Sequence, residues 1–315
     1  ELVIKDNKTN PAESVTQSRR LIQTDNVIAL MGPVSSAARY AMQEVASKFK
    51  VPQLYGIDYE GQHFSRYLIC YSTIPEHYIN PIIPYLLENS GPSFYIFGYD
   101  YIWPHRMSER ITQEANTLGG TISGVEFTPF GVENYSPTFE RIKNSGADNL
   151  MLILPGADGF NFLSQMAKFK FGRKITTVAF AADETYLNAV NKDDLEGVLT
   201  ALHFFSSWES DTFSAFVDSY RAKFGTNQSP TYSSKSHYDL IYLLKAAIEK
   251  SGSLEREAVT SALEELSLYN GEAEITLRAD HHFELPMYLA KFTQGELIVI
   301  QNLGHISPTD QRETP

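Results

Sequence analysis

The sequence has little cysteine and no excess of positive charge. Its 315 residues include a single cysteine, Cys70, so neither an intrachain disulfide nor a multi-cysteine metal site can form. Cys70 lies in an apolar run and is expected to be a buried strand thiol. Acidic side chains outnumber basic ones by 38 to 26, and the formal net charge is −12. We therefore expect no binding to nucleic acid or to an anionic membrane through a general basic field.

Long hydrophobic runs and a recognisable secretory leader are also missing. No apolar run reaches the roughly 20 residues that a membrane-spanning helix needs. The chain starts with an apolar segment, residues 2–4, which we expect to be a strand. Because a domain seldom starts inside a strand, we expect a further segment to precede Glu1. The N-terminus therefore does not indicate the compartment.

Signatures of catalysis are absent from the sequence. The histidines include the adjacent pair His281 and His282, but none has the H-E-x-x-H spacing of a zinc site. The sequence contains neither the G-x-S-x-G motif of a nucleophile elbow nor a glycine-rich phosphate loop. This favours a protein that binds its ligand without covalent chemistry, and it implies no metal and no cofactor.

Apolar segments of strand length alternate with amphipathic segments of helix length over residues 27–205. The strand-like segments are apolar along their whole length, which is typical of parallel sheets covered by helices on both faces. The sequence therefore predicts an α/β fold with doubly wound parallel sheets. The expected strands are 27–31, 51–55, 67–71, 93–98, 121–127, 149–154, 174–180 and 198–205, and the expected helices are 36–48, 77–89, 103–117, 135–144 and 159–169.

The alternation changes after Gly197. Helical segments then follow one another without strands between them, and the end of the chain has the pattern of an antiparallel hairpin. Residues 307–315 have the composition of a polar tail. The expected helices are 211–224, 234–251 and 254–266, and the expected strands are 274–277, 287–292 and 297–301.

Two segments are suited to carry the chain between two lobes. Residues 71–75 and 205–208 each lead from a strand toward a helix, and we expect both to be hinge strands. A length of 315 residues also fits two domains of about 100–150 residues each. Lobe one is expected to comprise residues 1–73 and 209–268, with a first strand and helix lying before Glu1, and lobe two to comprise residues 76–205 and 272–306.

Ligands of open parallel sheets bind at the carboxyl ends of the strands, and this rule selects candidate residues. Ser35 and Ser36 follow the first expected strand and begin a helix. A serine there either caps the helix or, with the free N–H groups, binds a ligand carboxylate or carbonyl. Tyr55 stands at the end of the next strand and can wall a site, and backbone groups around Ile57 can hydrogen-bond a ligand.

Three aromatic residues follow the expected strand 93–98, namely Tyr99, Tyr101 and Trp103. Such side chains form either a packed core or an amphipathic wall with polar tips. We expect at least one of the three to belong to the core. Tyr101 is the candidate that we expect to contact the ligand.

Two later strands end at further candidates. Gly156 follows the strand at 149–154, and a glycine permits close approach of the backbone to a ligand. Asp183 follows the strand at 174–180. Its carboxylate either caps the next helix or binds an ammonium or amide N–H group of a ligand.

Three short motifs carry a resemblance to a known family. Residues 98–104, Gly-Tyr-Asp-Tyr-Ile-Trp-Pro, resemble the segment G-S-D-Y-I-Y-P of short-chain amide receptors. Residues 58–61, Asp-Tyr-Glu-Gly, and 280–283, Asp-His-His-Phe, add to the likeness. The chain as a whole resembles the type I periplasmic binding proteins of the leucine/isoleucine/valine-binding class, and within it the short-chain amide and urea receptors. The resemblance implies two doubly wound lobes joined by hinge strands.

The resemblance also implies roles for individual residues. Ser35 matches the ligand-binding serine of the family, and Tyr55 matches the tyrosine that walls the amide site. Tyr101 matches the second-lobe aromatic residue that closes on the ligand, and Trp103 stands where amide receptors have a second tyrosine. Asp183 stands near the acid of the amino-acid binders, which suits a ligand ammonium group.

One departure bears on the ligand: Ile57 and Asp58 replace the Thr-Pro that is typical of the amide and urea receptors. The implied ligand is therefore an amino acid, branched-chain or other, a short amide or urea. The implied function is that of a periplasmic or otherwise extracytoplasmic binding protein of an ABC importer, which closes around its ligand by a hinge motion and is recognised by a membrane permease. The alternative is a ligand-sensing domain of a receptor or regulator on the same fold.

Overall fold

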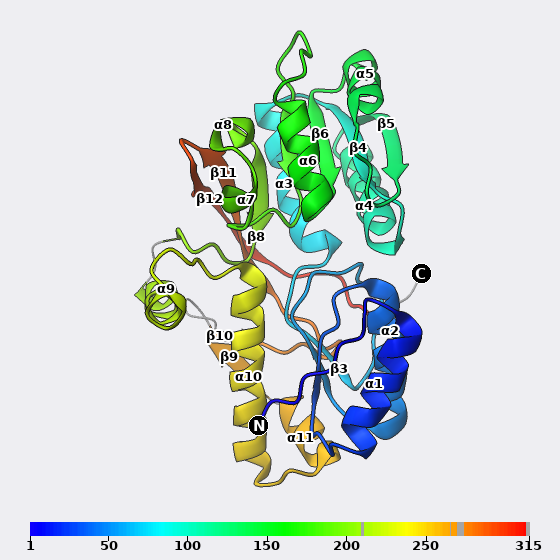
Figure 1. Cartoon of the computed structure of the whole chain (residues 1–315), viewed down its shortest axis with the longest axis vertical. Helices are drawn as coiled ribbons and strands as arrows, with labels where there is room; N and C mark the ends of the chain where they lie inside the picture. Colours follow the sequence, from blue (N-terminus) through cyan, green and yellow to red (C-terminus); the bar gives the residue numbers. More distant parts are fainter. Residues whose placement is uncertain (209–210, 265, 270–273, 313–315) are drawn as a thin grey trace. The chain divides into compact units, whose positions relative to one another are not determined.

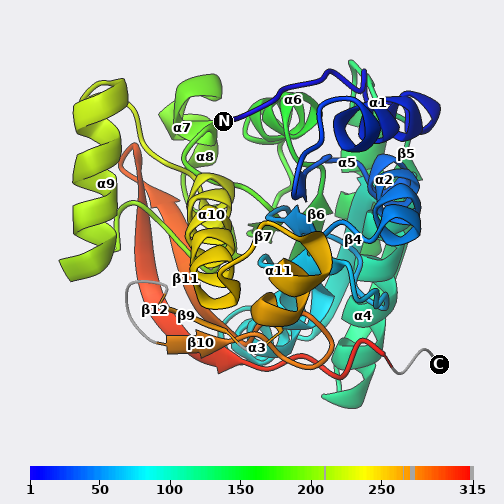
Figure 2. The ribbon, with the colours of Figure 1, turned by 90° about the horizontal axis from the view of Figure 1, so that it is seen from below.

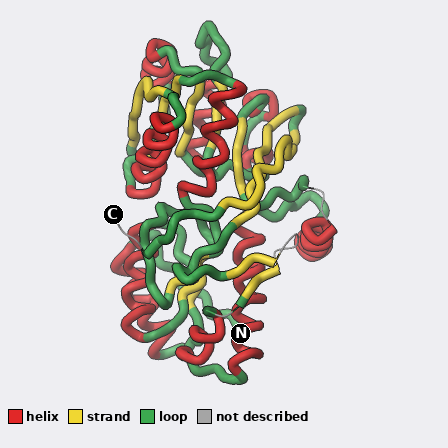
Figure 3. Tube along the Cα trace, turned by 180° about the vertical axis from the view of Figure 1, so that it is seen from behind, coloured by secondary structure: helices red, strands yellow, loops and turns green. Residues whose placement is uncertain are grey.

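The computed structural model describes residues 1–208, 211–264, 266–269 and 274–312 (Figure 1). The chain forms two compact units. Unit 1 comprises Glu1–Ile74, Ser233–Leu285 and Ser307–Pro315, and unit 2 comprises Pro75–Tyr232 and Pro286–Ile306. Figure 3 shows helices beside the strands of each unit.

Unit 2 is built on a seven-stranded sheet with the order β12-β11-β8-β7-β6-β4-β5. The five strands from β8 to β5 are parallel, and β11 pairs antiparallel with β8. A two-residue turn joins β11 to β12, as the sequence predicts. The strands are β4 Ser93–Tyr99, β5 Thr121–Thr128, β6 Asn149–Ile153, β7 Thr176–Ala179, β8 Leu199–Leu202, β11 Leu285–Thr293 and β12 Glu296–Ile306.

Helices cover both faces of this sheet, which explains why its central strands are apolar throughout. All five residues of β6 are buried. Figure 2 shows α3 and α6 on opposite sides of the strands, and α3 packs against α4. The expected doubly wound arrangement is thus present. The helices of unit 2 are α3 Pro75–Asn89, α4 Ile102–Thr117, α5 Ser136–Ser145, α6 Ala157–Met166, α7 Tyr186–Ala189, α8 Lys192–Leu195 and α9 Asp211–Phe224.

Unit 1 contains a three-stranded parallel sheet with the order β1-β2-β3. A hydrophobic core that includes Ile22, Leu30 and Met42 joins α1, β1 and α2. A separate antiparallel pair, β9 and β10, completes the unit. Its elements are α1 Pro11–Gln23, β1 Leu30–Met31, α2 Ser36–Phe49, β2 Gln53–Tyr55, β3 Leu68–Cys70, α10 Tyr232–Ser251, α11 Arg256–Leu263, β9 Ser267–Tyr269 and β10 Glu274–Thr276.

The N-terminal segment differs from the sequence-based expectation. Residues 2–4 form no strand, and Leu2 and Ile4 are largely exposed. The first regular element is instead the helix α1, which the hydrophobic pattern did not reveal. Its start was nevertheless encoded locally, because the side chain of Asn10 accepts a hydrogen bond from the N–H of Glu13 and Pro11 occupies the first turn.

The division between the units also differs from the expected one. The chain passes from unit 2 to unit 1 after Tyr232 and not near residues 205–209. The physical reason lies in α9, where the ring of Phe213 packs edge-on against Phe204, with 4.9 Å between ring centroids, and against Tyr288 at 6.4 Å. These contacts keep α9 in unit 2, although residues 209–232 were expected in lobe one.

The last two boundaries are shifted as well. Residues 274–285 belong to unit 1, whereas the second segment of lobe two was expected to begin at residue 272, which lies outside the described residues. Residues 307–312 are not a free polar tail. The side chain of Gln311 is buried, its backbone N–H donates to Asp280 at 3.0 Å, and its side-chain oxygen accepts from the N–H of Gln62. The tail is therefore part of unit 1.

Candidate functional site

In unit 1 the candidate site is the start of α2, which follows β1 at the carboxyl end of the sheet. Two side chains of β2 hold the loop before this helix: Gln53 donates to the carbonyl of Gly32 at 2.7 Å, and the Tyr55 hydroxyl donates to the carbonyl of Val34 at 3.0 Å. Ser35 occupies the N-cap position with an extended backbone, but its side chain makes no capping hydrogen bond. The first N–H groups of α2 therefore have no side-chain cap.

Ser36 has a different role from the expected one. Its hydroxyl is buried and donates to Glu60 at 2.8 Å. The second oxygen of Glu60 accepts from the guanidinium of Arg39 at 2.6 Å, and the side chains of this ion pair are 0% and 2% exposed. Ser36 is thus occupied by an internal partner. The prediction that it contacts a ligand is not supported by this geometry.

The buried pair of Arg39 and Glu60 was missed by the sequence analysis. The Arg39 guanidinium lies 4.0 Å from the ring centroid of Tyr40 and 4.5 Å from that of Tyr59. Burial by itself lowers the pKa of Arg39, but Glu60 and Tyr59 raise it above its usual value, so the guanidinium stays charged. Because Glu60 joins the first turn of α2 to the loop after β2, it holds the Ser35 region in place.

Tyr55 and Ile57 lie in this same part of unit 1. Tyr55 is fully buried, packs edge-on against Tyr59 with 5.7 Å between ring centroids, and uses its hydroxyl to hold Val34. It therefore supports the Ser35 loop, and the predicted direct contact of its ring with a ligand is not supported. Ile57 is half-buried and packs against the cluster that contains Tyr55 and Cys70. Cys70 is a buried strand thiol, as expected.

In unit 2 the candidate site is an aromatic group at the carboxyl ends of β4 and β5. Tyr99 and Trp103 are buried, whereas Tyr101 is partly exposed. Phe130, which the sequence analysis missed, stacks on Tyr99 with 4.2 Å between ring centroids and on Tyr101 with 5.8 Å. The side chain of Phe130 is 66% exposed. The rule of carboxyl ends, if applied to the strand before it, would have found this residue.

Trp103 lies behind this aromatic surface. Its ring centroid is 6.5 Å from that of Tyr101, and the side chain is 3% exposed. The indole N–H has no hydrogen-bond partner within the described ranges. Of the three aromatic residues at the end of β4 and just after it, Tyr101 thus remains the one with an accessible ring.

Gly156 and its surroundings form the next turn along the sheet. Gly156 has φ +82° and ψ −150°, a conformation that side-chain-bearing residues rarely adopt, and it caps the start of α6. The carboxylate of Asp158, in the first turn of α6, accepts from the N–H of Gly131 at 2.7 Å. The loop after β5, which carries Phe130, is thereby tied to the start of α6. A direct contact of Gly156 with a ligand stays a prediction.

Asp183 follows β7 and holds a local turn before α7. One of its oxygens accepts from the N–H of Thr185 at 3.0 Å and from the hydroxyl of the same residue at 2.5 Å. Burial raises the pKa of Asp183 above its usual value, although the bonds from Thr185 lower it. The bonds come from Thr185, the N-cap residue of α7, and not from N–H groups of the helix, so the predicted role of Asp183 as a helix cap is not what the structure shows. A role as a partner of a ligand ammonium group stays a prediction.

Glu184 is a further carboxyl group that the sequence analysis passed over. One oxygen accepts from the N–H of Ser206 at 2.6 Å, and the other is buried without a hydrogen-bond partner in the described part of the chain. Burial raises the pKa of Glu184 to about 7. Near neutral pH this carboxyl group is thus partly protonated, which makes it a weak partner for a ligand cation.

The described residues contain neither a metal-binding cluster nor a membrane-spanning helix. Within those ranges no three His, Cys, Asp or Glu side chains are grouped so that they could hold a metal ion. None of the helices in the same ranges has the length and apolar character needed to cross a membrane.

Comparison with known proteins identifies the family. A family model described as a periplasmic binding protein matches residues 1–296. The chain belongs to the periplasmic binding protein family. Within that family it is a type I protein of the leucine/isoleucine/valine-binding class, as the motifs indicated. The predicted family and fold class are therefore confirmed.

Individual relatives of this binding protein are distant. The Leu/Ile/Val-binding protein homolog 6 of Brucella abortus (strain 2308) is 29% identical over 140 residues, which cover 42% of this chain and 35% of that protein. The matched part thus spans about a third of the length of that relative. The homolog 6 of Brucella suis biovar 1 is 28% identical over 139 residues, with the same coverage.

Solved structures share the fold over almost the whole chain. The leucine binding protein LivK of Thermotoga maritima has a TM-score of 0.84 at 20% identity, covering 98% of this chain and 88% of that one. A solute binding protein of an ABC transporter from Rhodopseudomonas palustris, in complex with benzoate, has a TM-score of 0.88 at 16% identity, covering 98% and 87%. At such identities the likeness shows the fold alone.

Proposed function

We propose that this binding protein is the extracytoplasmic solute-binding component of an ABC importer and that it releases its ligand chemically unchanged. The observation that carries the proposal is the start of α2. Ser35 stands at the N-cap without capping the helix, and the loop before it is held by Gln53 and Tyr55. A helix start with free N–H groups and a free hydroxyl binds a carboxylate or a carbonyl oxygen.

This chemistry limits the ligand to small molecules with a carboxylate, amide or urea oxygen. Leucine and benzoate, which appear in the descriptions of the two structural neighbours above, share a carboxylate group. We propose that the ligand oxygen accepts hydrogen bonds from the Ser35 hydroxyl and from the N–H groups of the first turn of α2. The branched-chain and other amino acids, the short amides and urea are the candidate ligands.

The aromatic surface of unit 2 supplies the second half of the proposal. Tyr101 and Phe130 present accessible rings, and flat or apolar parts of a ligand pack well on such rings. We propose that the ligand docks first on unit 1 and that unit 2 then closes over it. Such closure is favoured only by contacts that exist in the closed state. A membrane permease would recognise the closed form.

A ligand screen tests the proposal. Thermal unfolding is measured with leucine, a polar amino acid, acetamide, urea and benzoate, each in excess. A ligand at a hundred times its dissociation constant should stabilise the protein by about 2.7 kcal/mol, which corresponds to a shift of several degrees. The radius of gyration in solution scattering should fall on binding.

Variants show whether the proposed site is used. Ser35→Ala should weaken binding of the ligand that emerges from the screen, because it removes a hydroxyl donor. Thr16→Ala is the matched control, since the Thr16 hydroxyl donates only to a carbonyl of its own helix in the same unit. Equal affinities of the two variants would exclude Ser35 from the site. Turnover of a bound compound would show that the protein is an enzyme.

A further inference from the structure

Unit 2 contains a cavity away from the faces described above. Its volume is about 540 Å³, within the range of small-molecule sites. The lining includes Thr176 and Leu199, the first residues of β7 and β8, and Asn89, the last residue of α3. The cavity therefore opens at the amino ends of these strands, whereas Asp183 follows the carboxyl end of β7.

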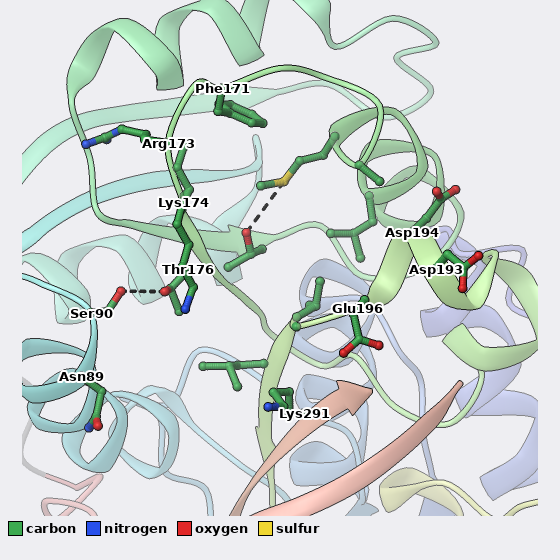
Figure 4. A pocket seen from close by; sticks show the side chains of 18 of the residues that line it. Asn89, Ser90, Phe171, Arg173, Lys174, Thr176, Asp193, Asp194, Glu196 and Lys291 are labelled. Carbon is green, nitrogen blue, oxygen red and sulfur yellow. Dashed lines mark hydrogen bonds between the residues drawn. The ribbon is translucent and has the colours of Figure 1, made fainter. Parts of the chain in front are cut away.

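The cavity has an apolar lining and two lysines that form no ion pair within the described ranges. Leu163, Met166 and Phe171 supply apolar surface (Figure 4). Lys174 and Lys291 also line it, and within the described ranges neither ammonium group forms a hydrogen bond or an ion pair, although Lys291 interacts electrostatically with Glu196. Lys174 is exposed and Lys291 is half-buried, and an anion bound between them would form charge-assisted hydrogen bonds with both.

The acidic residues of the same cavity are arranged differently. The two oxygens of Glu196 accept from the Thr293 hydroxyl and from the N–H of Gln294, both at 2.8 Å. Asp194 lies 4.0 Å from the ammonium of Lys168. Figure 4 shows the carboxylates of Asp193 and Asp194 on the far side of the cavity from the two lysines and directed away from them. Asp193 and Asp194 therefore do not neutralise the lysines, and Glu196 interacts with Lys291 alone.

The third cation in the lining, Arg173, is already occupied. Its guanidinium donates to the carbonyl of Ala147 and lies 3.9 Å from Asp148. Neutral polar groups stand beside the lysines instead: the Ser90 hydroxyl donates to Thr176 at 2.6 Å, and the amide of Asn89 lines the cavity. This combination suits an anionic head group attached to an apolar body.

We propose that this cavity is a second ligand site, which binds a small monocarboxylate with a hydrocarbon body. The carboxylate lies between Lys174 and Lys291, and the hydrocarbon part lies against Met166 and Phe171. The site is separate from the start of α2 and does not depend on the proposed transport function.

Methyl NMR with hexanoate as the probe tests this site. The chain has six methionines, and Met166 is the one that lines the cavity. Protein labelled at its methionine methyl groups is titrated with hexanoate, and Met166→Leu assigns the resonance. The Met166 methyl should shift and saturate. Neutral hexanamide, which has the same chain length, should bind about tenfold more weakly, because two ion pairs worth up to about 1.4 kcal/mol together are lost.

Two variants show whether hexanoate affinity depends on Lys174 and Lys291 or only on the positive charge of the nearby surface. The double variant Lys174→Met/Lys291→Met should lose about tenfold in affinity for hexanoate. Lys170→Met is the matched control, since Lys170 is exposed on the same surface but does not line the cavity, and it should bind as the wild type does. An unmoved Met166 resonance, equal binding of hexanamide, or unchanged affinity of the double variant would each overturn the proposal.

Discussion

Replacing Glu60 by Gln should destabilise unit 1 strongly. The Glu60 carboxylate lies 2.6 Å from the Arg39 guanidinium, and both side chains are almost completely buried. The substitution removes the negative charge and leaves the buried guanidinium without a counter-charge. Breaking a buried ion pair on one side costs about 3–5 kcal/mol. The free energy of unfolding of unit 1 should fall by about that amount.

Two spectroscopic probes distinguish unit 1 from the rest of the chain. Both tryptophans, Trp103 and Trp208, belong to unit 2, so their fluorescence reports on that unit, whereas far-UV circular dichroism reports on both. In urea unfolding of Glu60→Gln, the circular dichroism transition should move to lower urea. The matched control is Glu109→Gln, which removes an exposed ion pair with Arg106 at 2.7 Å and should cost less than about 1 kcal/mol.

A double variant tests whether the unpaired charge of Arg39 causes the loss of stability in Glu60→Gln. Arg39→Met/Glu60→Gln contains no buried charge at this position, so it should be more stable than Glu60→Gln alone. Ligand affinity of the single variant should fall as well, because Ser36 loses the carboxylate that fixes the first turn of α2. A cost below about 1 kcal/mol for Glu60→Gln, or a double variant less stable than the single one, would refute this reasoning.

Three further predictions concern unit 2. Tyr101→Ala should weaken ligand binding, measured by calorimetry, with little change in stability, because the ring is partly exposed; unchanged affinity would exclude it from the ligand wall. Burial raises the pKa of Glu184 to about 7 from an unfolded value near 4.5, so the carboxyl group keeps its proton to higher pH in the folded state than in the unfolded state. The free energy of unfolding should therefore fall as pH rises from 4.5 through 7, by up to about 3 kcal/mol. Glu184→Gln should remove that slope in urea unfolding, and an unchanged slope would contradict the assignment. Gly159→Ala should lower the melting temperature markedly, since its Cβ would lie 1.9 Å from the carbonyl oxygen of Leu154, and a wild-type melting temperature would contradict the packing there.

The parallel-sheet architecture was predictable because the central strands are apolar along their whole length. The apolar residues of β6 were enough to predict a strand there without knowledge of its neighbours in the sheet. The expected strand at 93–98 likewise lies within β4, Ser93–Tyr99. The strand expected at residues 2–4 was wrong, because a short apolar segment forms a strand only where a neighbouring strand pairs with it. The helix α1 could have been found from its Asn-Pro cap signal, although few of its residues are apolar.

The candidate site was predictable in part. The carboxyl-end rule found Ser35 and Tyr101 because it uses only strand positions. It did not reveal the internal partners of Ser36 and Tyr55, because these partners are distant in the sequence: Glu60 is 24 residues from Ser36, and Val34 is 21 residues from Tyr55. No local pattern reveals such pairings. The unit boundary after Tyr232 was missed for a similar reason, because it depends on aromatic contacts of α9 across the unit.

The measurement that tests the central claim most directly is a crystal structure with the ligand that gives the largest thermal shift. The account predicts a carboxylate, amide or urea oxygen of that ligand within hydrogen-bond distance of the Ser35 hydroxyl and of N–H groups in the first turn of α2. It also predicts the rings of Tyr101 and Phe130 against the rest of the ligand. A ligand bound elsewhere, with Ser35 and the start of α2 exposed to solvent, would contradict the account.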